Sequence, residues 1–486
     1  MNNQTIMIKV KNATIWSMIT QIITKLFSPI INIILARLLI PETFGVIATV
    51  TIVMSFTDII IDAGFPKYIV QHEFHNITEE RDNVTVAFWS TLIIAMLLWT
   101  LIIIFQHPIA TLVGNSYLSD VIVIAGIQLP INAMYSTLTA YHIRNFDNKD
   151  IFISKLAQAL LPLFVTIPLA WIGLRHWSII IGSISGTVIA TAILLLKSNW
   201  KPSFTYSIKL LRSMLSFSMW TVLEGFFLWL ATWVDIIIIS NVFSDYYLGL
   251  YVTAYNMVNA VLSMITSAIV PILFVALSRT QNEKNLFCLI FLKYQKMIAY
   301  FLFPIGIGIY LYRDFATYII LGMNWSEASF IIGSYALTAA IKITLVNINS
   351  EAFKAIGQPK FSLFLQVLDL CILIPACVIS TKYGFWSLVK VRALVRLDLI
   401  IPGLIFISII MKHKIRRFIQ NIEEPILCTI IMSFVSVGLK RINKSMYWQL
   451  SSVFLCVIIY ILTILIVDRS IFVGVYRFFI KRKYKL

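Results

Sequence analysis

Polar side chains recur at helical spacing inside the long apolar runs of this sequence. In the first run, Gln21, Lys25, Ser28 and Asn32 are separated by 4, 3 and 4 positions. On a helix with about 3.6 residues per turn, these steps place all four side chains on one face. Because this face carries an ammonium group among hydrogen-bonding groups, it predicts the wall of a water-filled cavity.

Other apolar runs also carry ionisable groups. Such a group at bilayer depth costs about 2.5 to 3.5 kcal/mol, so it normally faces water or the interior of a helix bundle. We therefore treat these residues as candidate functional groups, and Lys25, Asp58, Glu224 and Lys342 are the deepest of them. The remaining candidates in chain order are Asp62, Lys155, Asp235, Asp369, Lys390, Arg392, Arg396 and Asp398.

Two interpretations compete for these charges. We favour a cavity for the four deepest groups over structural pairing among themselves. Three others lie near predicted helix ends and could extend to the membrane surface; these are Asp62, Lys155 and Asp235. Arg392 and Arg396 could line a cavity or pair with a nearby aspartate, either Asp369 or Asp398. The cores of the third, fourth, sixth, ninth, thirteenth and fourteenth runs lack charge, which predicts a lipid-facing shell.

The composition indicates which elements must hold these groups. Of the 486 residues, 59% are hydrophobic and 13% are charged, and the mean hydropathy is +0.88. Soluble domains are only about 45 to 50% apolar, so we predict an all-α polytopic membrane protein. A bilayer-spanning helix needs about 20 apolar residues. Fourteen such runs are predicted, at 14–38, 45–61, 84–105, 121–140, 153–172, 177–196, 213–233, 249–275, 294–312, 328–346, 361–379, 385–411, 425–438 and 448–467.

The basic residues predict the orientation of these helices. A net charge of +17 would suggest a nucleic-acid partner in a soluble protein, but most of the 39 Lys and Arg residues lie in alternate short loops and in the C-terminal tail. Basic loops remain on the cytoplasmic side of a membrane. We therefore expect both termini in the cytoplasm and no nucleic-acid partner.

Two short matches indicate an internal duplication. Residues 35–45 align without gaps with residues 239–249, and Trp177-Ser178 matches Trp386-Ser387 at nearly the same offset. The offset equals six predicted helices. We therefore predict a six-helix lobe over residues 1–200, a second over 201–411, and two additional helices with a basic tail over 412–486. Transporters built from two repeats usually bind substrate between them, near mid-membrane.

Motifs of soluble enzymes are absent from the sequence. It contains no GxGxxG, P-loop, HExxH or GxSxG motif. His72 and His75 have a spacing that metals accept, but they lie in a polar loop without a nearby cysteine. The five cysteines lie in or beside apolar runs and form no CxxC pair. We expect no enzyme activity, no metal site and no organic cofactor.

Several motifs together resemble those of a known family. They are LARLLIPETFG at 35–45, DAG at 62–64, RNF at 144–146, GLYVTAY at 249–255, PILFVALSR at 271–279 and AIGQPK at 355–360, with Gly322, Trp325 and Ala328 before the last of these. In this order, over residues 10–411, they resemble the Wzx-type polysaccharide flippases of the MOP superfamily. The final two runs match only by position.

This resemblance implies a substrate and a mechanism. It implies an oligosaccharide linked to undecaprenyl pyrophosphate, flipped from the cytoplasmic to the periplasmic leaflet of the bacterial inner membrane for O-antigen, capsule or exopolysaccharide assembly. It also implies alternating access of two lobes around a cavity lined chiefly by the first, second, seventh and eighth helices. Membrane lipids, the polysaccharide polymerase and the chain-length machinery are the other candidate partners.

The candidate residues take roles within this implied function. Lysine ammonium groups suit phosphate oxygens, and side-chain amides suit sugar hydroxyls. The predicted substrate-binding residues are Gln21, Lys25, Asn32, Lys155, Asn256 and Lys342. The residues predicted to couple transport to a proton or a sodium ion are Asp58, Glu224 and Asp235, which could instead only balance the lysines.

Two other functions are retained as alternatives. A multidrug exporter of organic cations from the same superfamily should have acidic and aromatic cavity residues without buried lysines. An integral membrane polysaccharide polymerase or ligase should have a large periplasmic loop bearing Arg or His. The buried lysines and the short outward loops favour the flippase over both alternatives.

Overall fold

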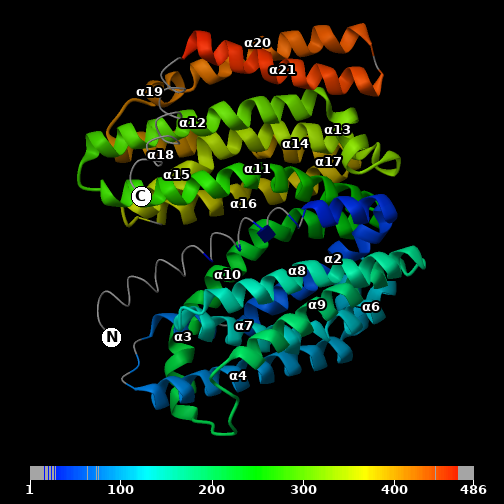
Figure 1. Cartoon of the computed structure of the whole chain (residues 1–486), viewed down its shortest axis with the longest axis vertical. Helices are drawn as coiled ribbons and strands as arrows, with labels where there is room; N and C mark the ends of the chain where they lie inside the picture. The colour runs from blue at the N-terminus through cyan, green and yellow to red at the C-terminus, as the bar shows by residue number, and fades with distance from the viewer. Residues whose placement is uncertain are drawn as a thin grey trace. The chain divides into compact units, whose positions relative to one another are not determined.

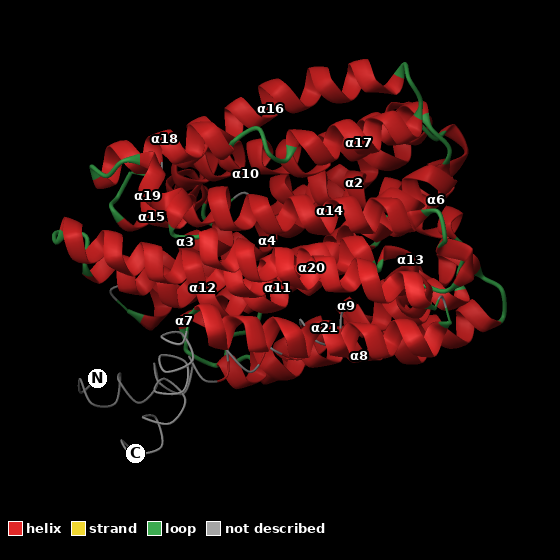
Figure 2. Cartoon of the chain, turned by 90° about the horizontal axis from the view of Figure 1, so that it is seen from above, coloured by secondary structure: helices red, strands yellow, loops and turns green. Residues whose placement is uncertain are grey.

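The computed structural model describes most of the chain. It covers residues 29–62 and 64–468 apart from positions 73, 75, 359 and 444, together with residues 16, 20, 23, 24 and 27. The side chains at 71, 215–221, 223, 224 and 268 are outside the description. Throughout these residues every regular element is helical and there is no strand (Figure 2). The chain divides into two compact units, Met1–Val252 and Thr253–Leu486.

Among the described residues after position 40, the first unit contains nine α-helices and the first turns of a tenth. They are α2 (Pro41–Asp62), α3 (Phe65–Gln71), α4 (Ile77–Ile104), α5 (Gln106–Leu112), α6 (Ser119–Ala125), α7 (Gln128–Arg144), α8 (Asn148–Trp171), α9 (Arg175–Lys197), α10 (Ile208–Val242) and the start of α11 (Asp245–Arg279), with the 3-10 turn η1 (Ser116–Leu118). A short apolar helix, Pro29–Leu38, precedes α2.

The second unit contains the rest of α11 and the remaining helices. They are α12 (Lys284–Leu311), α13 (Arg313–Ile320), η2 (Met323–Trp325), α14 (Ala328–Lys342), the π-helix η3 (Ile343–Asn347), α15 (Ile348–Ala355), α16 (Lys360–Thr381), α17 (Phe385–Val395), α18 (Ile400–Met411), α19 (Ile415–Gln420), α20 (Glu423–Ile442) and α21 (Met446–Val467). The last two helices, coloured orange and red, lie side by side and pack against α12 (Figure 1).

These helices confirm the predicted fold class. Within the described residues, thirteen helices are long and apolar enough to cross a membrane. They correspond to the second through the fourteenth predicted runs. The first run, 14–38, is described mainly over Pro29–Leu38. The chain is therefore an all-α, multi-pass membrane protein.

Some predicted boundaries are wrong. The seventh run ends at residue 233 in the prediction, but α10 continues to Val242 because residues 236–242 are mostly β-branched and apolar and extend the helix without interruption. The twelfth run is broken by a turn at 396–399, between α17 and α18. The thirteenth run, 425–438, looks short, but α20 extends it at both ends to 20 residues.

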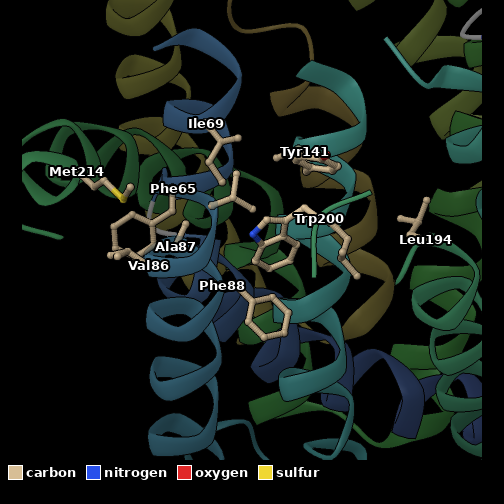
Figure 3. Packing of buried hydrophobic residues seen from close by; sticks show 12 residues of the cluster. Phe65, Ile69, Val86, Ala87, Phe88, Tyr141, Leu194, Trp200 and Met214 are labelled. Carbon is tan, nitrogen blue, oxygen red and sulfur yellow. The ribbon is translucent and has the colours of Figure 1, made fainter. Parts of the chain in front are cut away.

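The core of the first unit lies where α3, α4 and α7 meet the segment after α9. Figure 3 shows Trp200 inserted among Phe88, Tyr141 and other buried side chains of this cluster. Trp200 is 2% exposed, and its Nε1 donates a hydrogen bond of 3.2 Å to the hydroxyl of Thr85. The indole therefore satisfies its one donor while burying its ring. It fixes the segment that joins α9 to α10.

The compact units and the predicted lobes are divided at different places. Helix α10 packs against α2, α3 and α4, so the first compact unit extends beyond residue 200 to Val252. The division into compact units reflects how the helices pack, and it does not test whether the sequence contains an internal repeat. The lobes 1–200 and 201–411, and the additional region 412–486, stay predictions.

Candidate functional site

A polar cavity of about 380 Å³ lies between α2 and α7 in the first unit. Its lining includes Asp58 and Asp62 from α2 and Asn132, Tyr135 and Ser136 from α7. The Nδ2 atom of Asn132 lies 3.4 Å from Oδ1 of Asp58, and the hydroxyl of Ser136 donates a hydrogen bond of 3.1 Å to Asp62. A volume of this order is in the range of small-ligand sites.

The spacing of these residues explains how the cavity is built. Asp58 and Asp62 are four positions apart on α2, and Asn132 and Ser136 are four positions apart on α7. Residues four apart share a helix face, so each aspartate meets one neutral partner at the matching level. No ion pair joins either aspartate to a cation among the described side chains. The cavity can accept hydrogen bonds from a hydroxylated ligand or oxygen contacts to a cation.

Thr51, Ser55, Asp58 and Asp62 recur at helical spacing and form one polar face of α2. Ser55 accepts a 2.9 Å hydrogen bond from Nε1 of Trp229 on α10, and the ring of Trp229 lies 5.0 Å from that of Phe56. Thr51 donates instead to Ile47 within its own helix. Only the two aspartates at the end of this face reach the polar cavity.

The second unit contains a buried ionic cluster on α14, α16 and α17. The Nζ atom of Lys342 lies 3.3 Å from Oδ2 of Asp369, and the two side chains are 20% and 16% exposed. Arg392, Arg396 and Asp398 also interact electrostatically with Lys342. Three basic and two acidic side chains give this cluster a formal charge of +1 when all five are ionised.

Aromatic rings hold one of these arginines. The guanidinium carbon of Arg396 lies 4.2 Å from the ring centre of Tyr335 and 5.2 Å from that of Tyr255. Arginine stacks well on aromatic faces. Asp369 thus pairs with Lys342, and Arg396 lies against tyrosines. Arg392 interacts electrostatically with Asp398.

The backbone is irregular beside this cluster. Lys342 is the last residue of α14, directly before the π-helix Ile343–Asn347, and π-helical turns are frequent at functional sites. Arg396 and Asp398 lie in the turn between α17 and α18. Interrupted helices around buried charges are a common design of transporter binding sites.

A larger, apolar cavity of about 760 Å³ lies in the second unit. Its walls come from α11, α12, α13, α20 and α21, and nearly all of its lining side chains are aliphatic or aromatic. Gly308 of α12 lies on the wall, and a methyl group at this position would meet nothing within 4 Å. The cavity therefore has the size and lining to hold a hydrocarbon chain.

Polar contacts attach the α20–α21 hairpin to α12 on either side of this cavity. At one end Lys296 pairs with Glu424 and with Asp468, the latter at 2.6 Å. At the other end Nζ of Lys440 donates a 2.7 Å hydrogen bond to the carbonyl oxygen of Leu311. The helices are thus held together at their ends while an apolar space remains between them.

The predicted site residues fall into four groups. Gln21 and Lys25 are outside the described residues, as is the side chain of Glu224. Asn32 is half-buried, and Lys155 and Asn256 are exposed. Asp58 lines the polar cavity, and Lys342 belongs to the ionic cluster. Asp235 lies in neither place. Their roles in binding and coupling stay predictions.

Asp235 lies in a different environment from the one expected. It was placed near a helix end with access to the membrane surface, but it is 2% exposed inside α10. Its carboxylate accepts hydrogen bonds from the hydroxyl of Tyr251, at 2.6 Å, and from the amide of Ile236. The difference arises because α10 is longer than its apolar run predicts.

The sequence interpretation missed the contribution of α7 and α12. Both correspond to runs whose charge-free cores predict a lipid-facing shell, and both also make contacts inside their unit. Asn132 and Ser136 of α7 line the polar cavity, and α12 packs against α14 and α20. Counting only charges overlooked Asn and Ser, and their four-residue spacing was the available signal.

The His, Cys, Asp and Glu residues of the described segments are scattered over the two units. No group of three or more His, Cys, Asp or Glu residues that could hold a metal occurs within the described ranges. None of the five cysteines forms a disulfide; four are buried and Cys371 is exposed. Polar and apolar cavities within a helical bundle therefore define the candidate sites.

Helices with buried charges, a π-helix and large internal cavities define a polytopic membrane protein of the transporter class. The chain belongs to the polysaccharide biosynthesis protein family, whose model matches residues 34–330. An uncharacterized membrane protein in the cps region of Klebsiella pneumoniae is 23% identical over 78% of this chain and 77% of its own length. The succinoglycan biosynthesis transport protein ExoT of Rhizobium meliloti is 23% identical over 67% and 65%.

A solved structure shows the same fold. The lipid II flippase MurJ in an inward closed conformation matches with a TM-score of 0.77, covering 94% of this chain and 100% of that chain at 16% identity. This similarity agrees with the all-α, multi-pass fold that the sequence predicts. At this identity it establishes the fold of the chain and not its substrate.

Proposed function

We propose that this protein flips an undecaprenyl-pyrophosphate-linked oligosaccharide from the cytoplasmic to the periplasmic leaflet, by alternating access of two lobes and without enzyme chemistry. The family, the transport activity named for ExoT and the flippase named for MurJ support this proposal. The glycan would be a precursor of O-antigen, capsule or exopolysaccharide.

One observation carries the proposal. The second unit holds both an apolar cavity of about 760 Å³ and a buried ionic cluster with a net positive charge. A lipid-linked oligosaccharide has the two matching parts, a long hydrocarbon chain and an anionic pyrophosphate. An organic cation would be repelled by the cluster, so the pair of features favours the flippase over a drug exporter.

Desolvation explains why the substrate needs both features. Transferring an unpaired ion into hydrocarbon is prohibitively costly, whereas charge-assisted hydrogen bonds from lysine or arginine to phosphate oxygens offset that cost. In this proposal Lys342, with Arg392 and Arg396 beside it, binds the pyrophosphate. Lys25 and Lys155 are further candidates on the path of the anionic group.

The glycan and the coupling ion would use polar groups elsewhere. Side-chain amides such as those of Gln21, Asn32 and Asn256 suit sugar hydroxyls. Asp58, which lines the polar cavity, is the first candidate for proton or sodium coupling. Glu224 and Asp235 are the other two candidates for this role.

The proposed location is the bacterial inner membrane with both termini in the cytoplasm. A reporter fused after Arg417 should then lie in the cytoplasm, and one inserted near Asn115 should lie in the periplasm. Both reporters on one side would contradict the topology. The polymerase and chain-length machinery, which would use the flipped precursor, are proposed partners.

Membrane vesicles provide the direct test of the function. Vesicles of both orientations would be prepared with and without the chain, loaded with radiolabelled lipid-linked oligosaccharide on the cytoplasmic leaflet and probed with a membrane-impermeant glycosidase. We expect label to reach the periplasmic leaflet only when the chain is present. Equal transfer without it, or export of organic cations in place of lipid-linked glycan, would overturn the proposal.

A further inference from the structure

Basic and apolar side chains lie together on the outside of the chain from the end of α9 to the first turn of α10. Phe204 is 91% exposed and Ile208 is 75% exposed, and three cations near them in the sequence, Lys201, Lys209 and Arg212, are exposed as well. These five residues form the basic strip. Apolar side chains that reach hydrocarbon and long cationic side chains that reach water or headgroups are typical of a membrane surface. The strip therefore has the composition of an element that meets the boundary of a bilayer.

The positive charge of the basic strip is not balanced by acidic residues beside it. Residues 198–223 contain no Asp or Glu. Lys197, directly before them, is paired with Asp150 at 2.6 Å. In contrast, no described carboxylate forms an ion pair with Lys201, Lys209 or Arg212. Three formal positive charges thus face outward without a counter-charge at ion-pair distance in the described part of the chain.

Contacts with α4 hold the strip in a defined position. Nε1 of Trp89 donates a 2.7 Å hydrogen bond to the carbonyl oxygen of Ser203. The ring of Trp89 stacks on that of Phe204, with the ring centres 5.4 Å apart. The hydroxyl groups of Ser90 and Tyr206 lie 3.0 Å apart. The backbone of this segment is therefore fixed, although the side chains of the strip face outward.

The segment is also attached to the core and to the end of α9. Trp200 is 2% exposed within the cluster that Figure 3 shows. Nζ of Lys201 donates one hydrogen bond to the carbonyl oxygen of Leu195, and an ammonium group has two further donors. Lys201 is therefore positioned by α9 and can still bind an anionic oxygen outside the protein.

The sequence of α4 indicates the depth of the strip in the membrane. Residues 77–83 are mostly polar, and the apolar part of the helix begins at Val84. With a rise of 1.5 Å per residue, Trp89 lies about 7.5 Å beyond this change. Phe204, which stacks on Trp89, is then level with the boundary between headgroups and hydrocarbon, where aromatic side chains concentrate in membrane proteins.

We propose that the basic strip binds anionic phospholipids of the cytoplasmic leaflet. Their phosphodiester headgroups supply the negative charge that Lys201, Lys209 and Arg212 lack, and basic segments at a membrane surface are attracted to anionic lipids. Phe204 and Ile208 lie beside the first methylene groups of the acyl chains. Only the choice of leaflet depends on the orientation proposed above; the binding itself depends neither on transport nor on the glycan.

Quenching of a fluorophore measures which lipid surrounds the strip. The full chain with Cys371→Ser, which removes the exposed native thiol, and Thr205→Cys would be labelled at the new thiol and placed in phosphatidylcholine bilayers. A small fraction of phosphatidylglycerol carrying a nitroxide near its headgroup is then compared with phosphatidylcholine carrying the same nitroxide. We expect a preference for phosphatidylglycerol of roughly twentyfold or more at low salt, which falls as salt screens the charges. Equal quenching by the two lipids would overturn the proposal.

Neutral substitutions assign the preference to the three cations. Lys201→Gln, Lys209→Gln and Arg212→Gln should each lower it about fivefold, and the triple variant should abolish it. The control triple variant Lys412→Gln, Lys414→Gln and Arg416→Gln removes the same total charge from exposed positions outside the strip and should leave the preference unchanged. A preference that survives the first triple variant, or that the control abolishes, would contradict the assignment.

Two further measurements test the apolar contact and the identity of the bound lipid. Phe204→Ala should shift the emission of the fluorophore to longer wavelength as the segment moves toward water, whereas Phe204→Trp should not; unchanged emission in both would exclude insertion of the ring. Undecaprenyl pyrophosphate added at the same concentration should not displace phosphatidylglycerol. Displacement would make the strip a docking point for the transported precursor and would overturn the phospholipid assignment. All of these measurements use the purified chain without transport, so failure of the flippase proposal would leave their outcome unaffected.

Discussion

Lys342 has two possible roles, as a substrate ligand and as the partner of Asp369, and one set of variants separates them. Their 3.3 Å ion pair is largely buried. Removing one partner of a buried pair costs about 3 to 5 kcal/mol because it leaves the other charge unpaired. Since these side chains retain some exposure, we expect Lys342→Met to lose about 3 kcal/mol of stability and much of its abundance in the membrane.

The double variant Lys342→Met with Asp369→Asn removes both charges together. Replacing a buried pair by neutral groups is often close to neutral for stability, so its abundance should return to normal. Its transport should not, because a charge-assisted hydrogen bond to the pyrophosphate is lost. Such a bond contributes about 1.5 to 3 kcal/mol, which corresponds to a loss of roughly tenfold to a hundredfold in substrate affinity.

The measurements are protein abundance by immunoblot of membranes and initial transport rate as a function of precursor concentration. Lys382→Met, which removes a lysine from an exposed loop position, controls for loss of one positive charge. A double variant with normal abundance and normal transport would refute a substrate role for Lys342. Normal abundance of Lys342→Met alone would refute the claim that the ion pair stabilises the folded protein.

Three other predictions follow from the cavities. Filling the apolar cavity with Gly308→Phe should lower transport at least tenfold at normal abundance, whereas Gly438→Phe, where a side chain also has space but not in this cavity, should be neutral; equal rates would exclude the cavity as a binding site. Asp58→Asn should abolish the dependence of transport on pH or sodium while Asp62→Asn weakens it, and unchanged ion dependence in both would remove the polar cavity from coupling. Lys296→Met should leave Glu424 and Asp468 unpaired and loosen the α20–α21 hairpin, giving faster proteolysis after α19; an unchanged cleavage rate would contradict that role.

The sequence was sufficient to predict the elements that carry function but not how they pair. Apolar runs of about 20 residues predict spanning helices because hydrocarbon excludes any other open structure, and thirteen of the predicted runs are confirmed. The deep positions of Asp58 and Lys342 were also apparent, because a buried charge interrupts an apolar run. Both lie in interior polar sites.

The partners of these charges could not be predicted in the same way. Asn132 is 74 residues from Asp58, and nothing in either helix alone shows which helix lies beside it. The rings of Tyr255 and Tyr335 beside Arg396 could not be predicted either. Tyrosines are common in membrane helices, and only the packing of the helices brings two of them to one guanidinium. The predicted position of Asp235 is wrong for a different reason: residues 236–239 are apolar and continue α10, so Asp235 lies inside the helix and not at its end.

The burial of Trp200 has a consequence for how this chain can be divided. The segment after α9 joins α9 to α10 and crosses the boundary predicted between the two lobes, and its Phe204 is 91% exposed. Trp200 nevertheless fixes one side of it in the core, and α10 packs against α2, α3 and α4 on the other side. A protease cut near Phe204 would therefore sever the polypeptide without releasing either fragment, and two separately synthesised pieces meeting there could reassemble into a working protein.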